Sequence, residues 1–462
     1  LFSDLGSIEG IATTHRIAEN IKEATSLALN AGVEVDLGGN AYSKYLTRAL
    51  EEGLVEEETI DTAVTNVLRL KFKMGLFENP YVSVDIAKNI VGNKEHKNVA
   101  RRVARESVTL LKNSNNILPL SKEVRSIAVI GPNADNVYNQ LGDYTAPQDF
   151  DEVSTVLKGI KDAVSPNTIV EYRKGCAIRD TTNNNIDDAI EIANNSDVII
   201  LVLGGSSARD FKTEYIDTGA AQVNSNGSDI ISDMESGEGY DRSTLKLLGL
   251  QEKLLIDILD TGKPVIIIYI SGRPLDMNVA SQRADALLTA WYPGQEGGKG
   301  IADVLFGNYN PAGRLPISIP RHIGQIPIYY SLGKRSSYVE EPSTPLYAFG
   351  YGISYTNFEY KNLSINQSQD IINISCEVRN IGNRDGDEVI QLYIRDNISS
   401  VFTPPIQLKD FDKVFIKKGE SKTVNFKLTH KQLALFDIDM KEVVEPGEFT
   451  VMIGASSDDI RL

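Results

Sequence analysis

Cysteine, histidine and tryptophan are scarce in this chain of 462 residues, which has two cysteines, four histidines and one tryptophan. Cys176 and Cys376 fall in strand-like stretches of different predicted domains, so we expect both to be packed thiols, and the redox compartment stays open. The histidines lack the spacing of metal ligands, so the sequence predicts no metal site. These histidines are His15, His96, His322 and His430.

Basic residues are too few to balance the acidic ones. With 47 Lys and Arg against 63 Asp and Glu, the formal net charge is −16 at pH 7. Such a charge repels phosphate backbones and anionic lipid surfaces, so we expect no nucleic acid and no membrane as partner, and a neutral ligand instead. No apolar run approaches the roughly 20 residues that a membrane-spanning helix needs.

The first residues, LFSDLGSIEG, contain neither an initiating methionine nor the charged and apolar regions of a signal peptide. They have the pattern of the end of a buried strand. We therefore expect an upstream segment, on the same polypeptide or on another one. The sequence leaves the compartment undecided, and secretion or a periplasmic location is compatible with it.

Residues 1–85 have the pattern of the last part of a parallel α/β barrel. Helical periodicity in 17–32 is followed by a short strand-like stretch, 33–39, and by two further helices within 43–77. In such a barrel the active groups lie at the C-terminal ends of the strands. We expect Asp4 to lie at one of these ends.

Residues 86–340 predict a second α/β domain, with a mainly parallel sheet covered by helices on both faces. Helices are expected over 100–113 and 243–262. A nucleotide-binding function would need a G-x-G-x-x-G turn between strand and helix, and neither VIGPNAD nor LVLGGSSA has that pattern. The predicted strands are 126–131, 197–205, 264–272 and 284–294.

Residues 341–462 predict an antiparallel β-sandwich of the immunoglobulin or fibronectin type III kind. Helical patterns stop at about residue 357, and short alternating strands follow, separated by Gly, Asn and Asp turns. The aromatic stretch 347–354 is expected to join this sandwich to the α/β domain. The predicted strands are 358–365, 371–382, 387–396, 413–429 and 447–455.

A long polar loop, at about 205–242, separates a predicted strand from the next predicted helix. Loops of that length inside compact domains are uncommon and are usually functional, although a tolerated surface insertion remains the alternative. Its last part, MESGEGYDR, contains Glu235, Glu238 and Asp241, and Asp241 could also cap the following helix. The glycines beside Glu238 would let the backbone approach a ligand closely.

A carboxylate at the end of a barrel strand and another on a loop of a neighbouring domain suit the cleavage of a glycosidic bond. One carboxylate attacks the anomeric carbon while a protonated carboxyl group gives its proton to the departing oxygen. The two groups must face each other across the sugar, and a large separation in sequence does not prevent this.

Nine stretches, in order along the chain, resemble the landmarks of glycoside hydrolase family 3, the exo-acting β-glucosidases and β-xylosidases. The resemblance covers the whole chain and implies a barrel, an α/β sandwich and a fibronectin type III-like domain, in agreement with the three regions above. The stretches are SDLGSI, GVEVDLGGN, VLRLKFKMGLF, VARESVTLLKN, AVIGPNAD, SGEGYDRSTLKLLGLQ, WYPGQEGG, NPAGRLPISIP and YAFGYGISYTNFEY.

The resemblance implies that Asp4, in the family's S-D-x motif, is the nucleophile. It implies that Glu238, which precedes G-x-D-R, is the acid/base, so that Glu235 is a bystander. A nearby Asp4 carboxylate would disfavour ionisation of Glu238 before the first step, and esterification of Asp4 would then allow Glu238 to act as the base. No cofactor is implied.

Two departures from the family bear on substrate choice. Leu5 stands where many relatives carry a tryptophan that lines the sugar pocket. The family's sugar-holding Asp, Arg and Lys-His pair precede the nucleophile, in a region that this chain does not contain. Within the chain we expect substrate contacts from Leu5, Asp36, Arg209 and Asp210, and Asp36 has a structural hydrogen bond as its alternative role.

These features predict a retaining exo-β-glycosidase that acts on neutral β-linked oligosaccharides and releases terminal, non-reducing β-D-glucosyl or β-D-xylosyl residues. The choice between glucoside and xyloside stays open. A non-catalytic carbohydrate-binding or scaffolding remnant is the alternative from another class, and the intact contexts of Asp4 and Glu238 argue against it. An N-acetylglucosaminidase is less compatible, because relatives of that type commonly lack the C-terminal domains.

Overall fold

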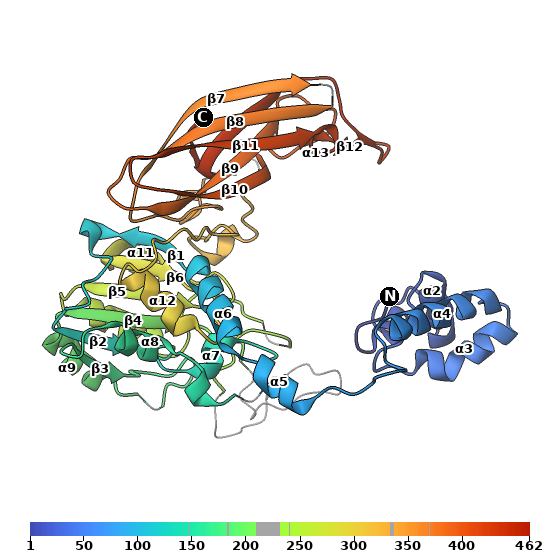
Figure 1. Cartoon of the computed structure of the whole chain (residues 1–462), viewed down its shortest axis with the longest axis horizontal. Coiled ribbons are helices and arrows are strands. Elements are labelled where there is room, and N and C mark those ends of the chain that lie inside the picture. The colour runs from blue at the N-terminus through green and yellow to red at the C-terminus, as the bar shows by residue number, and fades with distance from the viewer. Residues whose placement is uncertain (147, 183, 209–231, 240, 333–336, 369) are drawn as a thin grey trace. The chain divides into compact units, whose positions relative to one another are not determined.

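The computed structural model describes residues 1–146, 148–182, 184–208, 232–239, 241–332, 337–368 and 370–462. These residues form two compact units, which meet in sequence between Asn93 and Lys94. The first unit is helical, and the second contains an α/β domain followed by a β-sandwich (Figure 1).

In the first unit, the first residues pair with the segment around residue 35. Phe2 and Val35 form a parallel bridge, and Ser3 N donates to Val35 O at 2.9 Å. The short strand expected over 33–39 is therefore limited to this pairing among the described residues. The helices of the unit are α1 (Ser7–Thr13), α2 (Ile21–Asn30), α3 (Ala41–Glu51), α4 (Glu57–Lys73) and α5 (Val84–Ile90).

Local signals explain where α2 begins and ends. The side chain of Asn20 accepts a hydrogen bond from Glu23 N and so caps the first turn. One face of the helix, including Ala28 and Leu29, is buried. Gly32 follows with φ of 89°, a conformation that ends helices readily only at glycine.

The α/β domain has one six-stranded sheet in the order β1-β6-β5-β4-β2-β3. Only β1 and β6 pair antiparallel, so the mainly parallel sheet predicted from the long apolar stretches is confirmed. The strands are β1 (Thr109–Asn113), β2 (Ser126–Ile130), β3 (Ile169–Arg173), β4 (Val198–Gly204), β5 (Val265–Ile270) and β6 (Ala286–Thr289).

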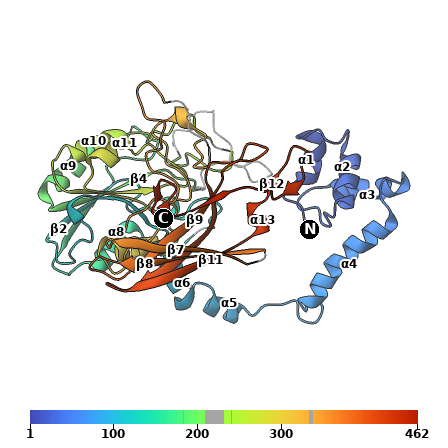
Figure 2. The ribbon, with the colours of Figure 1, turned by 90° about the horizontal axis from the view of Figure 1, so that it is seen from above.

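Helices cover both faces of this sheet (Figure 1 and Figure 2). Successive residues of a strand point to opposite faces. Leu201 packs in the core cluster that contains residues of α9, α10 and α11, whereas Val202 packs in the cluster that contains residues of α8 and α12. The helices are α6 (Lys94–Ser107), α7 (Val137–Leu141), α8 (Val156–Ala163), α9 (Ile186–Asn195), α10 (Gln251–Leu259), α11 (Asn278–Arg283) and α12 (Gly297–Leu305).

The helix predicted over 100–113 is wrong in its second half. Helix α6 ends at Ser107, and β1 then adds an antiparallel strand to the sheet, with Thr109 opposite Thr289. Leu110 is fully buried in this position. A short apolar run is compatible with both a helix and a strand. Here residues 109–113 form a strand because they pair with the edge of β6.

The helix predicted over 243–262 begins later, at Gln251. Leu245 and Leu247 are both buried, and a spacing of two residues does not place side chains on one face of a helix. Gly249 has φ of 60°, and a Cβ at this position would lie 2.8 Å from Ile178 O. Residues 243–250 therefore form an irregular segment before α10.

The C-terminal part is the predicted β-sandwich, built from two antiparallel sheets in the orders β10-β9-β14-β15 and β11-β8-β7. Their inner side chains, among them Ile374 and Ile390, form one buried core. Its elements are β7 (Phe358–Ser368), β8 (Ile371–Asn380), β9 (Gly386–Asp396), β10 (Gln407–Ile416), β11 (Ser421–Thr429), α13 (His430–Leu433), β14 (Phe449–Ser456) and β15 (Asp459–Ile460), with a small pair β12 (Leu435–Phe436) and β13 (Glu442–Val443).

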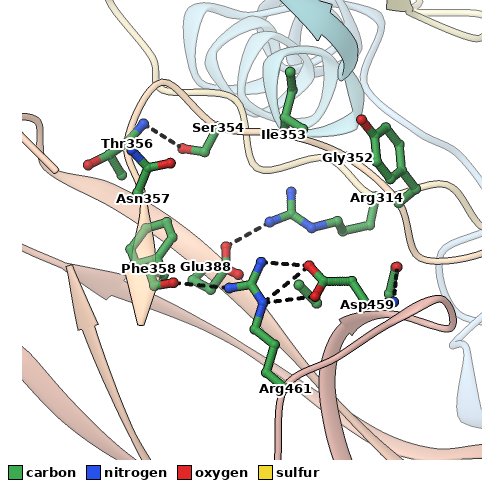
Figure 3. A pocket seen from close by; sticks show the side chains of 13 residues that line it. Arg314, Gly352, Ile353, Ser354, Thr356, Asn357, Phe358, Glu388, Asp459 and Arg461 are labelled. Atoms are coloured by element: carbon green, nitrogen blue, oxygen red, sulfur yellow. Dashed lines mark hydrogen bonds and ion pairs between the residues drawn. The ribbon is translucent and has the colours of Figure 1, made fainter. Parts of the chain in front are cut away.

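A polar joint connects the α/β domain to the sandwich around a cavity of about 170 Å³ (Figure 3). Arg314 Nη2 donates to Glu388 Oε2 at 2.7 Å, and the two side chains are 9% and 3% exposed. Tyr360 Oη donates to the other oxygen of the Glu388 carboxylate at 2.7 Å. On another side of the same cavity, Arg461 pairs with Asp459 (Figure 3).

The aromatic stretch 347–354 contacts both domains, as expected. Tyr347 and Tyr351 pack against the core of the α/β domain. From the sandwich, Gln391 Nε2 donates to Gly350 O at 3.1 Å. The stretch therefore belongs to the joint between the domains.

Candidate active site

Asp4 lies where the chain leaves its pairing with residue 35 and enters α1. Ser7 N donates to Asp4 O at 3.2 Å, and Asp4 Oδ1 accepts from Leu5 N at 2.7 Å. The residue is exposed. Asp4 is thus a carboxylate at the C-terminal end of an extended segment, and its catalytic role stays a prediction.

Leu5 and Asp36 were expected to contact substrate. Leu5 is 40% exposed and covers Gly38, where a Cβ would lie 2.0 Å from Leu5 Cδ1. Asp36 Oδ2 accepts from Tyr42 N at 3.2 Å, in the first turn of α3. Burial and the negative charge of Asp36 raise the pKa of Tyr42 to about 12. Asp36 therefore makes a structural hydrogen bond, which is its alternative role. Contact of Leu5 or Asp36 with substrate stays a prediction.

Residues 232–239 form the described end of the long loop and lie against the segment that follows β4. Glu235 N donates to Ser206 O at 2.9 Å. From the other side, Arg179 Nη1 donates to Met234 O at 2.8 Å. These bonds hold the segment beyond the carboxyl end of β4, which is the edge where open α/β sheets bind ligands.

Glu235 is buried in an ion pair with Arg242. Its Oε2 lies 2.7 Å from Arg242 Nη1, and the two side chains are 1% and 5% exposed. Ser236 Oγ donates to Glu235 Oε1 at 3.1 Å. A Cβ on Gly205 would lie 2.0 Å from the same oxygen, so glycine is required there. Glu235 therefore anchors the end of the loop and has no access to solvent.

Glu238, three residues further on, is exposed. Its neighbours Gly237 and Gly239 have φ of 128° and 81°, which only glycine adopts without strain. Tyr144 Oη donates a hydrogen bond to Glu238 Oε2. The segment thus presents one carboxylate at its surface and buries the other.

Tyr144 is the neighbour of Glu238 that sequence reasoning missed. It lies in the segment that follows β2 and α7, with φ of 58°, and Asp143 N in the same segment donates to Ser207 Oγ at 3.2 Å. The two contacting residues are 94 positions apart, and no local pattern marks such a contact. The available signal is the strand order, because neighbouring parallel strands bring the loops after them together.

The prediction that Asp241 caps the following helix is wrong, because α10 begins at Gln251. Asp241 instead accepts from Arg242 N at 2.7 Å and lies 3.3 Å from Arg273 Nη2. These donors, first the backbone N–H of Arg242 and then Arg273, hold the pKa of the Asp241 carboxyl below its usual value. Asp241 thus pairs with the segment after β5.

Arg209 and Asp210, the other expected substrate contacts, lie outside the described residues. Where the structure describes the chain, no three or more His, Cys, Asp or Glu side chains form a group that could hold a metal ion. Within the same ranges, no helix combines the length and the apolar character needed to cross a membrane.

Comparison with known sequences matches residues 108–355 to the glycosyl hydrolase family 3 C-terminal domain and residues 388–457 to a fibronectin type III-like domain. The chain is 37% identical to a protein of Formosa agariphila named beta-xylosidase and 36% identical to the periplasmic beta-glucosidase of Salmonella typhimurium. The alignments cover 100% and 99% of this chain and 64% and 62% of those proteins.

Solved structures give the same result. The beta-glucosidase of Listeria innocua, crystallised with glucose, is 32% identical and superposes with a TM-score of 0.85, over 100% of this chain and 61% of that one. A beta-glucosidase of Erythrobacter marinus is 35% identical, with a TM-score of 0.86 over 100% and 62%. The chain spans somewhat under two thirds of these relatives, and it belongs to glycoside hydrolase family 3.

Proposed function

We propose that this chain carries the nucleophile, Asp4, and the acid/base, Glu238, of a retaining exo-β-glycosidase. The observation that supports it best is the contrast between the two glutamates of MESGEGYDR, because Glu238 is exposed while Glu235 is buried against Arg242. A general acid must be within hydrogen-bond distance of the oxygen that it protonates, and the Glu235 carboxylate is instead enclosed in its ion pair with Arg242. The names of the Formosa and Salmonella relatives support terminal β-D-xylosyl or β-D-glucosyl residues as the sugar released.

In the first step of the proposed reaction, the Asp4 carboxylate attacks the anomeric carbon. Glu238 gives its proton to the glycosidic oxygen, the bond between that oxygen and the anomeric carbon breaks, and the aglycone leaves. The products are a glycosyl ester on Asp4 and an ionised Glu238. The two carboxyl groups are expected to be about 5 to 5.5 Å apart in the complex with substrate, as double displacement requires.

In the second step, water replaces the aglycone. The Glu238 carboxylate takes a proton from this water while the water oxygen bonds to the anomeric carbon and the ester bond to Asp4 breaks. Asp4 returns as a carboxylate and Glu238 returns protonated. The released sugar has the same anomeric configuration as the substrate.

The sugar itself needs further contacts. The relatives are longer than this chain, and the family resemblance places their sugar-holding residues before the nucleophile. We therefore propose an upstream barrel segment as the partner that completes the site, and a neutral β-linked oligosaccharide as the substrate.

The proposal is tested by labelling the active polypeptide that carries this chain with a 2-fluoro glycoside bearing a good leaving group. Peptide mapping should place the adduct on Asp4, and the first-formed product should be the β-anomer by nuclear magnetic resonance. Asp61, exposed on α4 in the same unit and not assigned to the chemistry or to sugar binding, is the matched control, and Asp61→Asn should still be labelled on Asp4. An adduct on another carboxylate, or an α-anomer as first product, would contradict the assignment.

A further inference from the structure

The proposed role of Glu238 as general acid depends on the orientation of its carboxyl group. It extends from a segment with glycine on either side, and a glutamate side chain has three rotatable bonds. Glu235 N and Ser236 N donate to Ser206 O at 2.9 and 3.4 Å and so fix the backbone just before Glu238. A general acid must be within hydrogen-bond distance of the oxygen that it protonates, so rotamer freedom lowers its efficiency.

Tyr144 makes the contact that could restrict this freedom. Its Oη donates to Glu238 Oε2, and the bond is stronger when the carboxyl group is ionised, because charge-assisted hydrogen bonds have roughly twice the strength of neutral ones. Tyr144 is 70% exposed, so the contact lies at the surface and not in the core.

The position of Tyr144 is itself determined by its surroundings. Gly142 has φ of 87°, and a Cβ there would lie 3.2 Å from the ring of Tyr292. Asp143 N donates to Ser207 Oγ at 3.2 Å, which ties the segment to the residues after β4. The backbone around Tyr144 and the backbone around Glu238 thus rest on the same stretch, residues 205–208.

We propose that Tyr144 is a positioning residue for the acid/base, which holds the Glu238 carboxyl group in one rotamer through both proton transfers. The inference rests on the proposed role of Glu238. The proton passes between Glu238 and the glycosidic oxygen or water, and Tyr144 keeps its own proton throughout.

The test compares Tyr144→Phe with the unaltered enzyme on aryl glycosides whose leaving groups range from dinitrophenol to phenol, in the active polypeptide that carries this chain. Poor leaving groups need acid assistance, so kcat/KM for the phenyl glycoside should fall roughly 10-fold or more, and that for the dinitrophenyl glycoside by less than about 2-fold. KM for both should change little. If Tyr144 had a merely structural role, its loss would lower kcat/KM for all substrates alike.

Tyr138→Phe is the matched control, because it removes the hydroxyl that accepts from Gln148 N at 3.1 Å in the same part of the chain. It should leave the dependence on the leaving group unchanged. Glu238→Ala, measured in parallel, separates the two hypotheses. If Glu238→Ala shows the loss for poor leaving groups and Tyr144→Phe does not, the role of Tyr144 is refuted and the acid/base stands. If neither variant shows it, both assignments are refuted.

Discussion

Arg242 Nη1 lies 2.7 Å from Glu235 Oε2, and this ion pair is almost fully buried. Glu238, three residues after Glu235, is exposed. One segment therefore contains a structural glutamate and a candidate catalytic one. Substitution of Glu235 is therefore expected to lower stability, and substitution of Glu238 is expected to lower catalysis.

Replacing Glu235 with Gln leaves the Arg242 charge buried without its counter-charge. Breaking a buried pair in this way costs about 3–5 kcal/mol, so the free energy of unfolding should fall by that order in urea denaturation. The matched control is Asp241→Asn, which breaks the pair with Arg273, in which the Asp241 side chain is 91% exposed. That variant should leave the free energy of unfolding nearly unchanged, because an exposed ion pair is screened by solvent. Equal losses in the two variants would show that the buried pair is not the anchor.

Glu238→Ala should have the reverse effect, with stability unchanged and catalysis impaired. Turnover of substrates with poor leaving groups should fall by roughly 10²–10⁴-fold, whereas activated aryl glycosides should lose less in their first step. Added azide should restore turnover of the activated aryl glycosides, because it attacks the glycosyl ester on Asp4 without the help of a base. The product should be a β-glycosyl azide, detected by mass spectrometry. In Glu235→Gln, azide should give no glycosyl azide. The opposite pattern would move the acid/base by three residues.

A third prediction concerns the joint in Figure 3, where Arg314 and Glu388 are both buried. Glu388→Gln should destabilise the contact between the α/β domain and the sandwich by about 3–5 kcal/mol, because Arg314 then keeps an uncompensated buried charge. Limited proteolysis should release the sandwich faster than in the unaltered chain. The control Glu359→Gln removes a more exposed pair, Lys361 with Glu359, and should not change the cleavage rate. Equal rates for the two variants would exclude Arg314–Glu388 as the fixing contact.

The sequence predicted the α/β domain and the sandwich because each has its own hydrophobic period. Continuous apolar stretches such as 197–205 predicted the parallel sheet, and alternating stretches such as 371–382 predicted the sandwich. It failed for β1, where a run after Ser107 fits both helix and strand. It also failed for residues 243–250, where Gly249 is left-handed and a distant carbonyl, that of Ile178, leaves no room for a Cβ. Both failures depend on neighbours far away in sequence.

The candidate site likewise contains residues that local sequence indicates and residues whose contacts depend on the fold. The family motif, which is a local signal, indicates Glu238. Tyr144 was not selected, since its contact with Glu238 depends on the order of β2 and β4 in the sheet. The role of Arg242 as the partner of Glu235 likewise depends on burial, which charge patterns in a polar loop do not reveal.

The last prediction is that a polypeptide of these 462 residues has little or no glycosidase activity by itself. A complete barrel has eight strands, whereas strand pairing in the described first unit is limited to the bridge between Phe2 and Val35. Val64 and Phe72 on α4 are 50% and 59% exposed, and exposed apolar side chains of this kind mark interaction surfaces when they form a patch. The family resemblance places the main sugar-holding residues before the nucleophile, and without them Asp4 and Glu238 are not expected to hold a substrate in reacting geometry.

Purified chain should therefore be assayed on aryl β-glucosides and β-xylosides, alone and after addition of the barrel segment of a relative such as the Salmonella protein. Activity should appear only in the mixture and should be lost with Asp4→Asn, because the mixture then has a complete site without its nucleophile. The barrel segment alone is the necessary control. Full activity from the chain without the added segment would refute the argument and would require sugar-binding groups among its own residues.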